Sequence, residues 1–130
     1  MGDSVFSQLM NLIRLMVLDG RCPWSREQSL LSMIEHILQE CQEFSDAVSG
    51  GKATQEIGSE AGDILTLTLI LCFLLEREGL TTTENIADQA IAKLRRRAPY
   101  LFRDCHKPIT LEEADHLWEL AKLREEKLQE

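Results

Sequence analysis

The feature that most constrains this chain is a pair of long segments with helical hydrophobic spacing, joined by a glycine turn. Apolar residues recur in steps of three and four from about Gln28 to Val48, and a second such segment runs from about Thr54 to Glu78. Ser49, Gly50 and Gly51 lie between them and are a strong stop signal for a helix. The pattern therefore predicts two helices that fold back antiparallel around this turn.

Three further helices are expected around this pair. Helical spacing predicts one from about Ser4 to Leu18, followed by a loop over residues 21–25. The capping-box pattern Thr81-x-x-Glu84 begins a helix that runs to about Arg97. A similar pattern, Thr110-x-x-Glu113, begins the last helix, whose charge-rich end we expect to fray. No segment alternates with the period of a strand, so we predict an all-α fold, an antiparallel bundle of about four to five helices.

The length of the chain limits the size of its core. A chain of 130 residues has room for one domain, which we place at residues 1–130, with one modest core. Residues 64–75 are apolar almost throughout and should be buried on several sides. In so short a chain, this burial favours a second copy that completes the bundle, as a homodimer or homotetramer. The apolar stretch is too short to span a bilayer, so no membrane partner is expected.

Charge and cysteine spacing narrow the class of protein further. The net charge of -8 argues against binding of a nucleic-acid polymer, which usually requires a basic excess, but it allows a nucleotide ligand. The four cysteines, Cys22, Cys41, Cys72 and Cys105, form no C-x-x-C pair, so neither a zinc knuckle nor a redox dithiol is expected. Because no secretory signal opens the chain, we expect reduced thiols and a cytoplasmic location.

Two acidic pairs are the strongest functional signal. Glu40 and Glu43 lie on the first long helix, and Glu60 and Asp63 lie on the second. Each pair has i, i+3 spacing, which places both carboxylates on one side of the helix. The two pairs lie at nearly equal distances on either side of Gly51, in the Gly50-Gly51 turn. If the helices are antiparallel and about 8–10 Å apart, the four carboxylates converge on one point.

Such a cluster is costly without a cation. Both pairs border apolar helix faces, and like charges held close together raise one another's pKa. A hard divalent ion relieves this repulsion, and ligands that are all oxygen favour magnesium, manganese or calcium over zinc. Magnesium suits phosphate chemistry because it also accepts substrate phosphate oxygens as ligands. One acidic i, i+3 pair is usually a solvated part of a helix surface; the site hypothesis rests on two level pairs.

A run of basic residues points to the same chemistry. Lys93 and Arg97 have i, i+4 spacing and share a helix face, as a clamp on a polyphosphate requires. The alternative interpretation is that cations near the C-terminus of a helix complement its dipole. Six basic residues fall in this short segment: Lys93, Arg95, Arg96, Arg97, Arg103 and Lys107.

Taken together, these motifs resemble the MazG-type nucleoside triphosphate pyrophosphohydrolases, an all-α group related to dimeric dUTPases and phosphoribosyl-ATP pyrophosphohydrolase. The family signature E-E-x-x-E followed by E-x-x-D reads Q-E-C-Q-E at residues 39–43 and E-A-G-D at residues 60–63. Residues 22–29, C-P-W-S-R-E-Q-S, are similar to the family's C-P-W-D-x-x-Q-T element. Residues 93–102 are similar to its K-x-x-x-R-x-P-H-V-F element, and Trp118 fits the tryptophan that follows.

The resemblance implies a reaction and a catalytic metal site. The family's magnesium ligands match Glu40, Glu43, Glu60 and Asp63, and manganese is a possible substitute. The implied activity is magnesium-dependent hydrolysis of an NTP or dNTP to the monophosphate and pyrophosphate, in the house-cleaning of nucleotide pools. A dimer or tetramer is also implied. These four acids are therefore the expected catalytic residues.

The resemblance also implies residues that bind the substrate. Lys93 and Arg97 match residues that contact phosphates, and Arg96 lies beside them. Trp24 is a candidate to stack on the base or border it, although a loop tryptophan after a proline is as often a packing anchor.

Three positions depart from the family pattern. Gln39 replaces the first glutamate of the signature, Ser25 replaces an aspartate and Tyr100 replaces a histidine. These changes leave two alternatives open. One is an enzyme of the same fold with a narrow substrate such as dCTP or dUTP. The other is a catalytically inactive helical module that binds a nucleotide or a partner protein.

Overall fold

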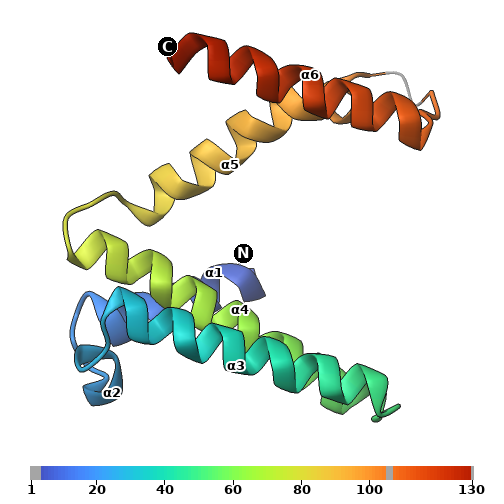
Figure 1. Ribbon diagram of the computed structural model, residues 1–130. Helices are drawn as coiled ribbons and strands as arrows, with labels where there is room; N and C mark the ends of the chain where they lie inside the picture. The colour runs from blue at the N-terminus through green and yellow to red at the C-terminus, as the bar shows by residue number, and fades with distance from the viewer. Residues whose placement is uncertain (1–3, 105–106, 130) are drawn as a thin grey trace. The chain divides into compact units, whose positions relative to one another are not determined.

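In the computed structural model, which describes residues 4–104 and 107–129, every regular element within these ranges is a helix (Figure 1). The all-α prediction is therefore confirmed. The short helix α2 replaces a predicted loop, and the 3-10 helix η1 was not expected. The elements are α1 (Val5–Val17), α2 (Pro23–Arg26), α3 (Leu30–Ser49), α4 (Thr54–Arg77), α5 (Thr83–Arg97), η1 (Pro99–Phe102) and α6 (Leu111–Gln129).

The chain divides into two compact units, Met1–Thr83 and Glu84–Glu130. We call them the N-terminal unit and the C-terminal unit, and we describe each by itself. A single domain over residues 1–130 stays a prediction. Cys22, Cys41 and Cys72 are free thiols, whereas Cys105 lies outside the described residues.

The core of the N-terminal unit is built by α1, α3 and α4. The two long helices α3 and α4 lie side by side and antiparallel, and α1 packs against α4 (Figure 1). The predicted helical hairpin is thus confirmed. Its core cluster takes residues from all three helices: Ile13, Val17, Met33, Ile70, Phe73 and Leu74.

Local side-chain chemistry fixes both ends of α3. Ser29 Oγ accepts a hydrogen bond from the Ser32 N–H at 3.1 Å, and Ser32 Oγ accepts one from the Ser29 N–H at 2.9 Å. This reciprocal capping satisfies N–H groups that a helix N-terminus otherwise leaves unpaired. At the other end, Gly51 has a φ of +65°, in the left-handed region that favours glycine. The sharp turn that aligns α3 with α4 therefore depends on this glycine.

Arg77 at the end of α4 holds the segment that carries α2. Its Nη1 donates to the Ser25 carbonyl at 3.1 Å, and its Nη2 donates to the Gln28 carbonyl at 2.9 Å. Gln28 in turn donates from Nε2 to the Trp24 carbonyl at 3.2 Å. Pro23 begins the short helix at a position where its missing N–H costs nothing. The α2 segment is thereby fixed to the end of the hairpin.

Helix α4 is also the most apolar element. By length and composition alone its 24 residues are long enough to cross a membrane, a criterion that a core helix of a globular protein also meets. The uninterrupted apolar stretch predicted from the sequence, residues 64–75, is only part of this helix. Ile70, Phe73 and Leu74 are buried in the core of the unit.

The C-terminal unit contains the rest of α5, then η1 and α6. Helix α5 begins at Thr83, two residues after the predicted cap at Thr81, and the Glu76 carboxylate accepts the Thr83 N–H at 2.8 Å. Thr110 Oγ1 accepts the Glu113 N–H at 3.1 Å, which confirms the predicted start of α6. The charge-rich end of α6 is helical through Gln129, so the expected fraying is not observed within the described residues.

Candidate metal site

The hairpin of α3 and α4 brings three of the four predicted acids together. Glu40 on α3 and Glu60 and Asp63 on α4 each offer a carboxylate oxygen, and these three oxygens all lie within 4.8 Å of one another. The i, i+3 spacing and the antiparallel turn produce this arrangement, as the sequence predicts. A single ion can therefore be reached from both helices.

Glu43, the fourth predicted acid, lies outside this set of three. Its side chain is exposed one turn beyond Glu40 on α3, and it lies near enough to raise the pKa of Glu40. Glu43 thus belongs to the same patch of negative charge, although its oxygens are not among the three that converge.

Two of the converging carboxylates are partly buried. Glu40 and Glu60 are half-buried, whereas Asp63 is exposed. The Oε2 atoms of Glu40 and Glu60 are shielded from solvent, and neither has a hydrogen-bond partner in the part of the chain that the structure describes. A buried acceptor without a partner costs free energy, of the order of 1–3 kcal/mol or more for a charged group. Both residues belong to the group of three converging carboxylates, and a cation bound there would offset this cost.

The pKa values of the same two carboxyl groups are raised. The hydrogen bond with Glu43, then burial, then the charges of Glu43, Asp63 and Glu60 raise the pKa of Glu40 to about 7. Burial, followed by the charges of Glu43, Asp63 and Glu56, raises the pKa of Glu60. These shifts follow the direction that like charges and desolvation require. A divalent cation would reverse both effects.

The donor set fits a hard divalent ion. All three converging ligand atoms are carboxylate oxygens, and the described residues place neither a cysteine sulfur nor a histidine nitrogen in the group. Oxygen-only sets suit magnesium, manganese or calcium. A cation at this point would also give the unpartnered Oε2 atoms of Glu40 and Glu60 a favourable partner.

An aromatic pair lies one helical turn from the acids. Trp24 on α2 is 41% exposed, and its ring centroid lies 5.2 Å from that of His36, with the ring planes tilted by 57°. His36 precedes Glu40 by four residues on α3, so the two side chains share a helix face. Trp24 is therefore a packing partner of His36 that still offers ring surface to a ligand.

The predicted phosphate-binding residues lie on α5. Lys93 is exposed, but Arg96 and Arg97 are already engaged within the C-terminal unit. Arg96 Nε lies 2.7 Å from Glu125 Oε1, and Arg97 Nη2 lies 2.8 Å from Glu125 Oε2. The guanidinium of Arg97 also lies over the Trp118 ring, 5.3 Å from its centroid. Arg97 is thus held by two partners on α6, which the predicted clamp with Lys93 did not include.

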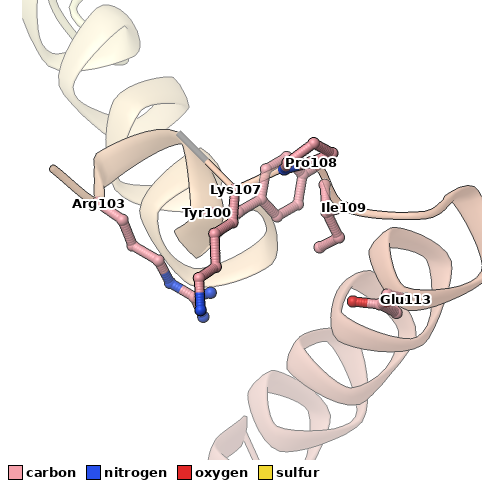
Figure 2. Close-up of a pocket in the computed structure, with 6 residues that line it drawn as sticks. All are labelled: Tyr100, Arg103, Lys107, Pro108, Ile109 and Glu113. Atoms are coloured by element: carbon pink, nitrogen blue, oxygen red, sulfur yellow. The ribbon is translucent and has the colours of Figure 1, made fainter. Parts of the chain in front are cut away.

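A small cavity in the C-terminal unit collects two other residues of the basic run. Its volume is about 190 Å³, and none of the four predicted acids lines it. Figure 2 shows the Arg103 guanidinium and the Lys107 amine, both from the segment that follows η1, extending in the same direction. The lining residues are Tyr100, Arg103, Lys107, Pro108, Ile109 and Glu113.

The sequence did not predict the roles of two residues that contact candidate site residues or the segment that carries them. Glu125 binds both arginines, and Arg77 fixes the segment that carries Trp24. Neither belongs to a motif, and Glu125 is one of several acids in a charge-rich helix end. The only available signal was indirect: a charged residue close to an apolar segment usually has a partner.

The chain is similar to a known protein family. The family described as "MazG nucleotide pyrophosphohydrolase domain" matches residues 28–102, which is more than half of the chain. The match spans α3, α4 and α5, and it includes all four predicted acids. The chain belongs to the MazG nucleotide pyrophosphohydrolase family.

Individual relatives are consistent with this assignment. The chain is 29% identical over 99 residues to the uncharacterized protein YabN of Bacillus subtilis, covering 76% of this chain and 20% of that protein. It is 26% identical over 100 residues to the nucleoside triphosphate pyrophosphohydrolase/pyrophosphatase MazG of Thermotoga maritima, covering 77% of this chain and 39% of that protein. It is 28% identical over 86 residues to a nucleoside triphosphate pyrophosphohydrolase of Escherichia coli K12, covering 66% and 32% respectively.

A solved structure supports the fold. The crystal structure of a MazG-related protein from Thermotoga maritima matches with a TM-score of 0.78 and 26% identity, covering 90% of this chain and 98% of that one. The curated relatives are much longer, since the chain spans only 20–39% of their length. Their activities as whole proteins therefore reach this chain only as proposals.

Proposed function

We propose that this chain hydrolyses a nucleoside triphosphate, NTP or dNTP, to the monophosphate and pyrophosphate, with magnesium bound by Glu40, Glu43, Glu60 and Asp63. The observation that carries the proposal is the convergence of three carboxylate oxygens within 4.8 Å, two of the carboxylates having a buried oxygen without a partner. Membership of the MazG family supports the same reaction. The physiological role that fits it is house-cleaning of nucleotide pools.

The acidic residues would divide the work at the metal. Glu40, Glu60 and Asp63 are the nearest ligands, and Glu43 is close enough to Glu40 to join them after a side-chain rotation. When bound, magnesium supplies charge neutralisation to the triphosphate and lowers the pKa of a coordinated water. One of the four carboxylates, or Glu56 one turn before Glu60, accepts the proton of the attacking water. Manganese has the same ligand preference and is a substitute.

The remaining candidates bind the substrate. Lys93, Arg96 and Arg97 carry the positive charge that offsets the phosphates, and a guanidinium matches phosphate oxygens in a bidentate manner. In this proposal Trp24 borders or stacks on the base, and its ring beside His36 is accessible to a ligand at 41% exposure. Base and sugar preference then depend on the surroundings of Trp24, where Ser25 stands in place of the family's aspartate.

We also propose a homodimer or homotetramer in the cytoplasm, with no polymeric nucleic acid or membrane partner. Apolar side chains on the outer face of α3 support the oligomer. Leu31, Ile34 and Leu38 are 75%, 43% and 64% exposed, respectively, and recur at helical spacing. Such a stripe on a short chain is typical of a helix that packs against another subunit.

The experiment that tests the function is pyrophosphate release from the common NTPs and dNTPs, with magnesium and with EDTA. Release that requires the metal supports the proposed reaction. Similar rates for many nucleotides indicate a broad enzyme, whereas one preferred pyrimidine dNTP indicates a specialist. Absence of release by folded protein with magnesium or manganese would contradict the proposal and favour an inactive module, which nucleotide binding without turnover would then identify.

A further inference from the structure

Glu125 occupies a position that the proposed chemistry does not yet explain. It lies on α6 beyond the residues that match the family, and its one carboxylate binds two consecutive arginines of α5. The side chains of Arg97 and Glu125 are only 17% and 20% exposed, while Arg96 is 49% exposed. The pair of Arg97 and Glu125 is therefore shielded from solvent, and its geometry is more constrained than that of a surface ion pair.

The contacts of Arg97 fix its guanidinium in both position and rotation. Glu125 Oε2 accepts from Nη2 at 2.8 Å, and Glu125 Oε1 lies 3.5 Å from Nε. The Trp118 ring covers one face of the same group, with 5.3 Å between the guanidinium carbon and the ring centroid. One edge and one face of the planar group are thus occupied.

The opposite edge of Arg97 keeps its donors. A guanidinium has five N–H donors, and the carboxylate uses those on the edge formed by Nε and Nη2. Nη1 and the outer N–H of Nη2 have no acceptor among the residues that the structure describes. This outer edge has the fork geometry that binds two phosphate oxygens at once.

We propose that Glu125 is a positioning residue: it orients Arg97 so that the outer guanidinium edge binds a phosphate group of the triphosphate substrate. This inference rests on the proposed function, because it assigns Arg97 a phosphate ligand. Glu125 itself touches no substrate atom. Trp118 assists Glu125, because its ring packs on one face of the guanidinium and restricts the rotation of this group.

A purely structural role makes a different prediction from this one. If Glu125 only links α6 to α5, its replacement changes stability but leaves phosphate binding by the folded protein unchanged. General electrostatics predicts a third result, since removal of a negative charge near cations tightens anion binding. Positioning alone predicts that loss of the Glu125 charge weakens the binding of a phosphate.

The test uses inorganic pyrophosphate as the probe, in metal-free buffer, with the full chain. Glu125→Gln keeps the size of the side chain and is compared with Glu126→Gln, which removes the same charge from an exposed neighbour. Binding is followed by NMR through the indole N–H of Trp118, assigned by comparison with a Trp24→Phe variant. Circular dichroism confirms that each variant is folded.

We expect Glu125→Gln to weaken pyrophosphate binding by about tenfold, the effect of losing one well-oriented charge-assisted contact. Glu126→Gln binds as tightly as the wild type or slightly tighter. Glu125→Asp, which keeps the charge, recovers part of the loss, and Arg97→Lys loses binding because lysine has no fork. Unchanged or tighter binding by folded Glu125→Gln would overturn the proposal, as would absence of binding by the wild type.

Steady-state kinetics separates this inference from the proposed function. With magnesium present, Glu125→Gln should raise KM for the triphosphate by about tenfold and change kcat by less than about threefold, the pattern of a lost binding interaction. If the wild type turns over no nucleotide but Glu125→Gln still weakens pyrophosphate binding, the proposed reaction fails and the positioning role stands. A fall in kcat at unchanged KM contradicts the positioning role.

Discussion

Glu40 on α3 and Glu60 on α4 each bury one carboxylate oxygen, Oε2, without a hydrogen-bond partner in the described part of the chain. The two residues are twenty positions apart, and the Gly51 turn brings them to the same level of the hairpin. The hydrogen bond with Glu43, burial and the neighbouring charges raise the pKa of Glu40, and burial followed by the charges of Glu43, Asp63 and Glu56 raises that of Glu60. The hairpin is therefore destabilised locally at the point where it can bind a cation.

Magnesium should stabilise the wild-type protein but not a Glu60→Gln variant. A ligand that binds only the folded state adds about 2.7 kcal/mol when its concentration is a hundredfold above the dissociation constant. In EDTA at neutral pH, Glu60→Gln should be the more stable of the two proteins, because the substitution removes one of the repelling charges. Thermal unfolding with magnesium and with EDTA measures both effects.

The control is Glu35→Gln, which removes an exposed charge from the same helix, α3, and leaves the acidic cluster intact. It should keep the magnesium response of the wild type. Equal magnesium stabilisation of Glu60→Gln and the wild type would show that the ion binds elsewhere.

Alanine at Glu43 or at Asp63 should abolish magnesium-dependent turnover while the helices remain formed. We expect pyrophosphate release to fall by at least about a hundredfold, since metal-assisted hydrolysis depends on the ligands that hold the ion. Glu35→Ala serves as the matched control and keeps activity. Normal turnover by Asp63→Ala with an unchanged far-ultraviolet spectrum is the result that excludes this site.

Arg77→Met should destabilise the protein and release the α2 segment. The substitution keeps most of the aliphatic stem but removes two charged donors to the carbonyls of Ser25 and Gln28. Such bonds contribute about 1.5–3 kcal/mol, and the carbonyls lose their partner. Chemical denaturation measures the loss, and Arg21→Met, at an exposed position, is the control. Wild-type stability of Arg77→Met would mean that water replaces both contacts without cost.

Two glycines should respond to alanine in opposite directions. Gly51 has a φ of +65°, and a left-handed alanine there costs about 1–2 kcal/mol. Gly58 lies within α4, where an added Cβ meets no atom within 4 Å. Gly58→Ala should therefore stabilise the helix by about 0.5–1 kcal/mol. Denaturation of both variants in EDTA tests the hairpin geometry, which a stabilising Gly51→Ala would contradict.

The sequence predicted the acidic cluster because only short-range geometry is involved. Two i, i+3 pairs at nearly equal distances from a glycine turn lie at the same level of an antiparallel hairpin, and Glu40, Glu60 and Asp63 converge there. Glu43 is not among the converging residues. Which way its side chain turns depends on its rotamer and surroundings, and no pattern in the sequence reports that.

The contacts of Arg97 could not be predicted in the same way. Arg97 and Glu125 are 28 residues apart, on helices joined by η1 and a further segment, and their meeting depends on tertiary packing. The pattern around Glu125 is a charge-rich helix end, which in most chains is solvated. The short helix α2 had a readable signal, since Pro23 occupies the first helical position, but four residues are too few for a hydrophobic period.

The last prediction concerns the pH dependence of the Glu125 contact. Hydrogen bonds from Arg97 and Arg96 lower the pKa of Glu125 from its ordinary value of 4.5 to about 2. A carboxyl whose pKa is depressed by folding stabilises the folded state fully above its ordinary pKa, and this contribution is lost as the pH falls through the folded value. Wild type should therefore be more stable than Glu125→Gln at pH 6. The difference should shrink from about pH 4.5 downward and vanish near pH 2. Thermal unfolding followed through the Trp118 indole N–H measures it, and a difference that stays constant from pH 6 to about pH 2 would show that the Glu125 charge does not carry the contact.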